Sequence, residues 1–350
     1  MKKIKMKTFV SIILFLFLGL SCVNRIEHTP EKLDRKADQY SIRIAVGSCN
    51  KVDEPNVFWD DIAEQSPEAF VWLGDIVYAD SNDISVIQSE YNKLKEITNY
   101  TRLTEQMQIF GIWDDHDYGK NDGGQEFEIK VESQQALLDF LDVSKEDQRR
   151  TQEGIYTSHL LQNNYGTVEL LMLDTRYFRS SLTPDTENGR RYKSNTDTTT
   201  TLLGNAQWQW LEKKIENSQA NFLVIVSSIQ LLSNQHQFEK WENLPHEREK
   251  MITLIKCFAD KNIFVVSGDR HISEFSMMPI GEDRQLIDFT SSGLTHSYSS
   301  FSGEPNPYRV KEVVSDPSYG IIDFNLKNNT VQAYMMGDKK QIQQELEVSY

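Results

Sequence analysis

Short apolar stretches recur along the chain, and three of them run directly into acidic residues and histidines. Residues 70–73 precede Gly74 and Asp75, residues 109–113 precede Asp114, Asp115, His116 and Asp117, and residues 263–267 precede Gly268, Asp269, Arg270 and His271. Apolar runs of this length that end in turn residues predict buried strands. Ligands of open α/β sheets bind at the carboxyl ends of strands, so the pattern predicts a functional site there.

Helical periodicity alternates with strand patterns over most of the chain. It predicts helices over residues 58–63, 87–97, 131–141, 206–215 and 247–259. Further strands are predicted at 42–46, 168–173 and 222–226, and then, where strands dominate, at 286–290, 321–324 and 330–335. This order predicts an α/β domain with two sheets or a mixed sheet. Residues 180–203 are polar and without periodicity, which is typical of a functional or disordered loop.

The N-terminus predicts a targeting segment, followed by a tether. Lysines precede an apolar run, residues 9–20, that is short for a membrane span and ends at Ser21-Cys22. Residues 1–22 resemble a bacterial lipoprotein signal peptide with Cys22 lipidated, which predicts an extracytoplasmic, membrane-anchored protein. An ordinary signal peptide and an uncleaved anchor helix are the alternatives. Residues 23–40 are polar and predict a tether, and the domain is expected over 41–350.

Net charge and cysteine usage limit the partners. The formal net charge of −15 argues against a nucleic-acid partner, because phosphate backbones would be repelled. It does not exclude phosphate chemistry, because bound cations reverse the local field. Cys49 and Cys257 are able to pair in an oxidising compartment. Cys257, however, shares a helical stripe with apolar residues, which favours a free buried thiol.

The residues at the strand ends have the chemistry of metal ligands. Asp75, Asp115, Asn121, Asp269 and His271 supply oxygen donors and an imidazole, a mixture that suits iron, manganese, zinc or calcium. A carboxylate such as that of Asp75 bridges two ions in sites that clamp a phosphoryl group. His116 has the chemistry of a general acid that protonates a leaving alkoxide. The alternative is a set of solvated carboxylates without a metal.

The order and spacing of the motifs resemble the alkaline phosphatase D-like (PhoD-like) metallophosphatases of the calcineurin-like phosphoesterase superfamily. The motifs are Gly47-Ser48-Cys49, Gly74-Asp75-Ile76-Val77-Tyr78, Trp113-Asp114-Asp115-His116-Asp117, Leu173-Asp174-Thr175-Arg176, Ser267-Gly268-Asp269-Arg270-His271 and Thr290-Ser291-Ser292-Gly293-Leu294-Thr295-His296. The resemblance covers Ser41 to about His296. It implies two facing mixed β-sheets flanked by helices, an αββα sandwich of the α/β class.

The resemblance also implies a ligand set containing iron and calcium. Cys49 and Tyr78 stand where the family binds iron, and Asp75 stands at the bridging position. Asp115, Asp269 and His271 complete the set, and Asn121 matches a family residue that binds calcium. Zinc or manganese are alternatives. A buried structural thiol for Cys49 and a core aromatic for Tyr78 are the non-functional interpretations.

Arginines and one further histidine are candidates for substrate contact. Arg176 follows a strand and has the fork geometry that holds a phosphate oxygen, although a salt bridge to a neighbouring acid is an equal alternative. Arg149 and Arg150 are further phosphate candidates, and His296 is a candidate pocket residue.

The expected function is an extracytoplasmic phosphoesterase that hydrolyses phosphate monoesters or diesters through a metal-activated water. Its partner would be a small phosphate ester or a phosphate-containing polymer or lipid. One alternative is a phosphodiesterase acting on such a polymer or lipid, with residues 180–203 and their Arg190, Arg191 and Lys193 as a gate. The other is a non-catalytic surface binding lipoprotein, which would be expected to lack several ligands.

Overall fold

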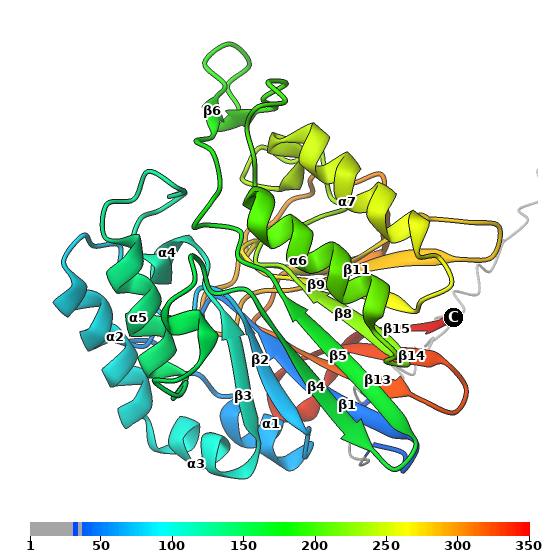
Figure 1. Cartoon of the computed structure of the whole chain (residues 1–350). Coiled ribbons are helices and arrows are strands. Elements are labelled where there is room, and N and C mark those ends of the chain that lie inside the picture. The colour runs from blue at the N-terminus through cyan, green and yellow to red at the C-terminus, as the bar shows by residue number, and fades with distance from the viewer. Residues whose placement is uncertain (1–30, 34–36) are drawn as a thin grey trace, which may run out of the picture. The chain divides into compact units, whose positions relative to one another are not determined.

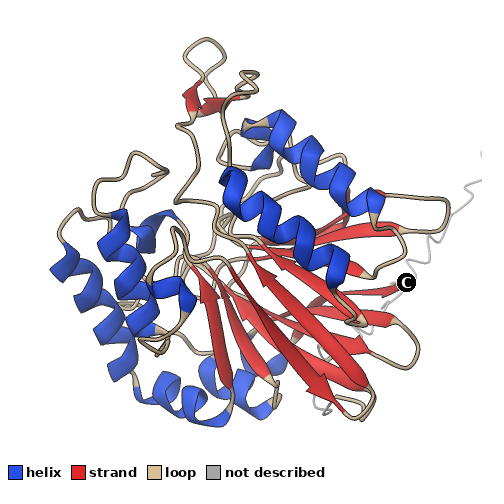
Figure 2. Cartoon of the chain, in the orientation of Figure 1, coloured by secondary structure: helices blue, strands red, loops and turns tan. Residues whose placement is uncertain are grey.

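Two mixed β-sheets form the body of the structure, a computed structural model that describes residues 31–33 and 37–350 (Figure 1). The first sheet has the strand order β15-β14-β13-β1-β2-β3, and the second has the order β12-β10-β11-β9-β8-β5-β4. The parallel strands are β1, β2 and the edge strand β3 in one sheet and β5, β8, β9 and β11 in the other. The flanking strands pair antiparallel. The predicted α/β fold with two mixed sheets flanked by helices is confirmed (Figure 2).

The elements have the following bounds. The strands of the two sheets are β1 Ser41–Gly47, β2 Ala69–Leu73, β3 Gln108–Ile112, β4 Thr157–Asn163, β5 Gly166–Met172, β8 Phe222–Val226, β9 Ile263–Ser267, β10 Ser273–Pro279, β11 Gln285–Ser291, β12 Arg309–Val314, β13 Tyr319–Asn325, β14 Thr330–Met336 and β15 Ile342–Ser349. The α-helices are α1 Trp59–Glu64, α2 Ile84–Glu96, α3 Thr98–Gln106, α4 Asp115–Tyr118, α5 Lys130–Phe140, α6 Gly204–Asn217 and α7 Pro245–Cys257. A small separate ribbon consists of β6 Thr183–Pro184 and β7 Tyr192–Lys193.

Four of the parallel strands are buried along their whole length, which explains their continuous apolar sequences. Every residue of β1, β2, β8 and β9 is buried. The two sheets face each other through one apolar cluster, in which Phe222 of β8 packs on Phe324 of β13 with ring centroids 5.3 Å apart. A second cluster lies beneath α6 and α7, which cover the outer face of the second sheet (Figure 1).

Several elements differ from the sequence-based expectation. The strand at residues 108–112, expected to be buried, is the edge strand β3, and its first half is partly exposed. The strands β4, β10, β12 and β15 were not predicted, because their polar and apolar residues do not form an uninterrupted apolar run. Residues 180–203, expected as a structureless loop, contain the β6–β7 ribbon, which Figure 1 shows projecting beyond the two sheets.

The packed domain begins before Ser41, within the span expected to be a tether. Leu33 is buried in the main apolar cluster, and its backbone N–H donates to the carbonyl of Lys340 at 3.1 Å. The side chain of Gln65 donates to the carbonyl of Leu33 at 2.8 Å. The predicted signal peptide, residues 1–22 with Cys22, lies outside the described residues. Among the residues that the structure describes, no helix is both long and apolar enough to cross a membrane.

Both cysteines within the described part are free, but only one of them is buried. Cys49 is buried at the end of β1, whereas Cys257 is exposed at the last position of α7. The expectation of a buried Cys257 was wrong. The apolar face of α7 is formed by Met251, Ile252 and Ile255, and the thiol lies outside it.

Candidate metal centre

The predicted ligands converge where β1, β2, β3 and β9 end. Cys49 follows β1, Asp75 follows β2, and Asp115 begins the short helix α4 directly after β3. Asp269 and His271 follow β9 of the second sheet. The carboxyl ends of strands from both sheets therefore build one site.

One group of potential metal ligands gathers around Asp75. The Sγ of Cys49 lies 3.3 Å from Oδ2 of Asp75, and the hydroxyl of Tyr78 lies 3.4 Å from the same oxygen. The Tyr78 hydroxyl also lies 3.1 Å from Nε2 of His271. The ligand atoms of Cys49, Asp75 and His271 lie within 4.8 Å of one another. A thiol, a phenol, an imidazole and a carboxylate are thus within reach of a single ion.

A second group shares Asp75 with the first. Asp75, Asp115 and His116 present ligand atoms within 4.8 Å of one another, and so do Asp114, Asp115 and Asp269. The side-chain amide of Asn121 donates to Oδ2 of Asp115 at 2.9 Å, so Asn121 lies beside this group, while its own side-chain oxygen accepts from Arg191. Asp75 belongs to the first two of these three groups, and Asp115 connects the second to the third, so Asp75 stands where a bridging ligand would be expected.

The burial of these groups fits bound cations. Oδ1 of Asp75 and Oδ1 of Asp115 are buried and accept no hydrogen bond from the described residues. Burial and the neighbouring Cys49 raise the pKa of Asp75 well above its usual range, and burial and Asp114 do the same for Asp269. Burial also raises the pKa of the Cys49 thiol to about 11. Buried carboxylates without partners are costly unless a cation compensates them, so the donors fit metal ions.

The backbone at the site adopts conformations that non-glycine residues seldom occupy. The φ angles are 59° at Cys49, 49° at Asp75, 68° at Asp269 and 55° at His271. Left-handed backbone costs free energy and persists only where the surroundings fix it, commonly at functional sites. The loops also approach one another closely: a Cβ on Gly74 would lie 2.5 Å from the Cβ of Asp114. Glycine before Asp75 is therefore required for the two strand ends to meet.

His116 lies beside the carboxylates and is held by a residue that the sequence did not single out. Its Nδ1 lies 2.8 Å from the carboxylate of Asp80, and its ring packs on Tyr78 with centroids 4.2 Å apart. Burial opposes protonation of His116, but the hydrogen bond that its Nδ1 donates to Asp80 and the charge of Asp75 outweigh this effect and raise the pKa of His116 to about 10. His116 therefore carries a proton at neutral pH, and it lines the cavity beside Asp115.

Arg176 does not line the cavity and is not available to a phosphate group. Its guanidinium is fully buried, and Nε donates to Asp114 at 2.6 Å while Nη1 donates to Glu239 at 2.6 Å. Nη2 also bonds to Asp114. The sequence left open a phosphate ligand or a salt bridge, and the geometry is that of the salt bridge. Arg176 holds Asp114 in place beside the ligand Asp115.

The other arginine candidates are also paired elsewhere. Arg149 pairs with Asp147 at 2.9 Å, and Arg150 pairs with Asp139 at 2.8 Å. Neither residue lines the cavity at the metal cluster. His296, by contrast, lies at the site: its ring centroid is 4.4 Å from that of His271.

Sequence reasoning missed residues that position the ligands rather than bind metal. Oγ of Ser292 lies 3.0 Å from Sγ of Cys49 and accepts the backbone N–H of His271 at 2.8 Å, so it joins two ligand loops. Asp117 accepts the backbone N–H groups of Asp114 and Ile76, which fixes the loops after β2 and β3. Asp117 and Ser292 stand inside the recognised motifs, and that adjacency was the available signal.

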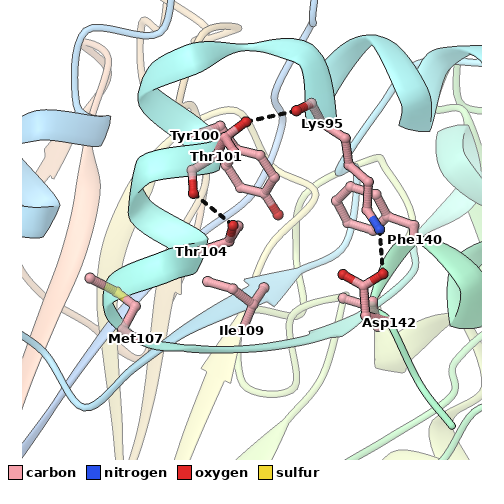
Figure 3. Close-up of a pocket in the computed structure, with 9 residues that line it drawn as sticks. Lys95, Tyr100, Thr101, Thr104, Met107, Ile109, Phe140 and Asp142 are labelled. Atoms are coloured by element: carbon pink, nitrogen blue, oxygen red, sulfur yellow. Dashed lines mark hydrogen bonds and ion pairs between the residues drawn. The ribbon is translucent and has the colours of Figure 1, made fainter.

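A cavity of about 250 Å³ opens over the metal cluster. It is lined by Asp115, His116, Asn121, Asp122, Arg191, Phe238, Glu239, Asp269, Arg270, His271 and Tyr298. A larger hollow of about 400 Å³ lies elsewhere, between α3 and the end of α5 (Figure 3). Its charged residues, Lys95 and Asp142, pair with each other at 2.7 Å, and none of the clustered metal-ligand groups lines it. The smaller cavity is therefore the candidate functional site.

Known proteins share this fold and sequence pattern. Residues 44–333 match the sequence profile of the PhoD-like phosphatases. Alkaline phosphatase D of Bacillus subtilis (strain 168) is 24% identical over 236 residues, which cover 61% of this chain and 40% of that protein. The chain thus spans less than half the length of this relative.

Solved structures agree at the level of the fold. A structure of PhoD superposes with a TM-score of 0.70 at 16% identity, covering 88% of this chain and 68% of the other. GAP50, the anchor in the inner membrane complex of Plasmodium, superposes with a TM-score of 0.59 at 14% identity, covering 88% of this chain and 89% of the other. Since the family profile extends from β1 to β14 and includes every ligand-bearing loop, the chain belongs to the PhoD-like phosphatase family.

Proposed function

We propose that this chain is a metal-dependent phosphoesterase that hydrolyses phosphate monoesters or diesters. The convergence of Cys49, Asp75, Tyr78 and His271 with a carboxylate group around Asp115 is the observation that supports this most directly. Membership of a phosphatase family supports the same reaction class. A non-catalytic binding protein would not need this complete set of ligands together with a protonated histidine beside them.

The chain's own residues divide the work of the site. Cys49, Tyr78 and His271 would hold one ion with Asp75, and Asp115, Asn121 and Asp269 would hold a second ion with the same Asp75. The resemblance suggests iron and calcium, with zinc or manganese as alternatives. Bound ions would supply an activated water and neutralise the charge of the phosphoryl group.

His116 is the residue proposed to move the proton. Nδ1 of His116 donates a hydrogen bond to Asp80, and His116 lines the cavity beside Asp115. Because its raised pKa keeps it protonated at neutral pH, it has a proton to give to the leaving alkoxide. A leaving group that departs as an alkoxide needs this proton more than one that departs as a stabilised phenolate.

Location and natural substrate are part of the proposal. The lysine-rich and apolar start of the chain, ending at Cys22, supports a lipid-anchored enzyme outside the cytoplasm. Small phosphate esters are the proposed substrates, and a phosphate-bearing polymer or lipid is the second candidate. The acidic net charge of −15 disfavours a nucleic-acid partner.

Turnover of two chromogenic esters tests the function. Full-length protein with added iron and calcium should hydrolyse p-nitrophenyl phosphate or bis-p-nitrophenyl phosphate. The His116→Ala variant should retain its metals but lose rate, most strongly with an alkyl phosphate. Wild-type protein that binds metal and hydrolyses no phosphate ester would contradict the proposal.

A further inference from the structure

The segment between β5 and α6, residues 180–203, reaches the cavity beside the candidate metal ligands. Its base is closed by the backbone bond from Ser180 N–H to the carbonyl of Thr201 at 2.8 Å. Further along, the N–H of Tyr192 donates to the carbonyl of Gln237 at 3.2 Å, and the N–H of Asn195 donates to the carbonyl of Asn243 at 2.8 Å. Residues 180–203, called the strap below, are thus hydrogen-bonded to residues 237–243. The latter segment includes Phe238 and Glu239, which line the cavity.

Arg191 is the residue of this strap that lines the cavity. Its Nη2 donates to the side-chain oxygen of Asn121 at 3.1 Å and pairs with the carboxylate of Asp122. Tyr192 donates its hydroxyl to the same carboxylate at 2.7 Å. Asp122 in turn donates its backbone N–H to Asp115 at 2.6 Å. Arg191 is therefore connected to the proposed ligands Asn121 and Asp115 by a short chain of contacts.

The other arginines near the cavity are buried and paired with acids. Arg176 and Arg179 are buried against Glu239. Arg270 pairs with Glu304 through Nη2 and lies over the ring of Phe238, and although its Nε has no partner, its side chain is only 5% exposed. The side chain of Arg191 is 43% exposed, and only its Nη2 is engaged by an acidic group. Of the described cations that line the cavity, Arg191 has the most freedom to contact an incoming anion.

We propose that Arg191 is a substrate-binding residue that selects phosphate monoesters over diesters. The inference rests on the proposed phosphoesterase function. A monoester is a dianion with three non-bridging oxygens at neutral to alkaline pH, whereas a diester is a monoanion with two. A guanidinium gains more from the dianion, and the third oxygen gives it a contact that a diester lacks. The cavity volume of about 250 Å³ is also below the usual range for ligand sites, which suits a small ester.

Kinetics and calorimetry on full-length protein test this role. Arg191→Ala should raise the KM for p-nitrophenyl phosphate about ten-fold or more while kcat changes less than about three-fold. Calorimetry should show inorganic phosphate binding weakened by a similar factor. The KM for bis-p-nitrophenyl phosphate should change less than about three-fold. Arg191→Lys should retain part of the phosphate affinity, because lysine keeps the positive charge. The affinity should stay below that of wild type, because lysine lacks the paired N–H donors of the guanidinium.

Two further variants separate substrate binding from a structural role. Arg190→Ala removes the neighbouring exposed arginine, which does not line the cavity, and should match wild type in every measurement. Tyr192→Phe removes the other partner of Asp122 but keeps the guanidinium, so phosphate affinity should stay near the wild-type value. Equal loss of metal content in Arg191→Ala and Tyr192→Phe would overturn the proposal in favour of a structural role.

Other outcomes also count against Arg191 specifically. A wild-type KM and phosphate affinity in Arg191→Ala, or an equal loss for monoester and diester, would overturn the inference while leaving the phosphoesterase function intact. If the wild type turned over neither ester, the proposed function would fail, and the calorimetric comparison would still decide whether Arg191 binds phosphate.

Discussion

At the scale of single residues, the site separates side chains that bind from side chains that position. Within residues 114–117, Asp115 and His116 line the cavity, whereas Asp114 and Asp117 are buried in hydrogen bonds that hold the loop. The sequence identified the loop because four polar residues follow an apolar strand. It assigned Asp115 as a metal ligand and His116 as a general acid, but it gave Asp114 and Asp117 no role, because their roles depend on Arg176 and Ile76, which come from other strand ends.

Asp80 is predicted to position His116. Asp80→Asn should lower kcat about ten- to hundred-fold for an alkyl phosphate and much less for p-nitrophenyl phosphate, because only the poor leaving group depends on the proton. Metal content should be unchanged. Asp83→Asn, which removes the negative charge of the exposed N-cap residue of α2, is the matched control and should leave both rates at the wild-type value. A loss of equal size with both substrates would argue against this role.

The buried Arg176 is predicted to be a stability residue. Arg176→Met should lower the free energy of unfolding by about 3–5 kcal/mol, because it leaves the buried carboxylates of Asp114 and Glu239 without their partner. Urea denaturation measures the change. Arg102→Ala, which removes an exposed pair with Asp60, should cost less than about 1 kcal/mol. Equal costs for the two variants would contradict the assignment.

At the scale of elements, strands with a continuous apolar sequence were predictable, whereas the antiparallel strands β4, β10, β12 and β15 were not. Strands β2, β8 and β9 are buried on both faces, so their sequences are continuous apolar runs. Strand β4 has only one buried residue, Leu161, and its pairing with β5 depends on contacts distant from its own sequence. The edge strand β3 was predicted to be buried for the opposite reason: its sequence is apolar, but Ile109 and Phe110 are partly exposed.

The two edge strands meet through a histidine that gives stability a pH dependence. His159 of β4 stacks on Phe110 of β3 with ring centroids 4.0 Å apart. Burial, reinforced by the charge of Arg149, lowers the pKa of His159 to about 4. Between pH 6.5 and 4 the unfolded chain binds a proton that the folded chain does not, so this residue removes stability as the pH falls through that window.

Replacing His159 should remove that dependence. Between pH 6.5 and pH 4, the free energy of unfolding should fall less in His159→Phe than in wild type. The difference between the two proteins should be up to about 3 kcal/mol. Denaturation curves across this pH range measure the slope for both proteins. Identical slopes would show that His159 titrates with its ordinary pKa in the folded state.

At the scale of the whole molecule, the order of motifs predicted more than their individual chemistry did. Each strand-end carboxylate has an ordinary explanation as a solvated turn residue. Their repetition at the ends of β2, β3 and β9 indicated one shared edge, and the two-sheet fold brings that edge together. The Arg191 strap was not predictable in detail, because residues 180–203 lack periodicity and their position depends on docking to residues 237–243.

The start of the folded domain provides a test at this scale. A protein that begins at Ser41 lacks Leu33 and its bonds to Lys340 and Gln65. It should be less stable than one that begins at Glu31 by about 2 kcal/mol, because a buried leucine and its hydrogen bonds are lost. Thermal or urea unfolding of the two proteins decides the point, and equal stabilities would place these residues outside the packed core.

Elemental analysis of the purified full-length protein, beside Cys49→Ala and Asp75→Ala, tests the metal centre most directly. The wild type should contain about two metal ions per chain, with iron among them. Asp75→Ala should lose both ions, since Asp75 belongs to both ligand groups, whereas Cys49→Ala should lose mainly the iron. Phosphoesterase activity should fall with the metal in each variant. A wild type that remains metal-free after incubation with iron and calcium, or variants that keep full metal content, would contradict a metal centre built around Asp75.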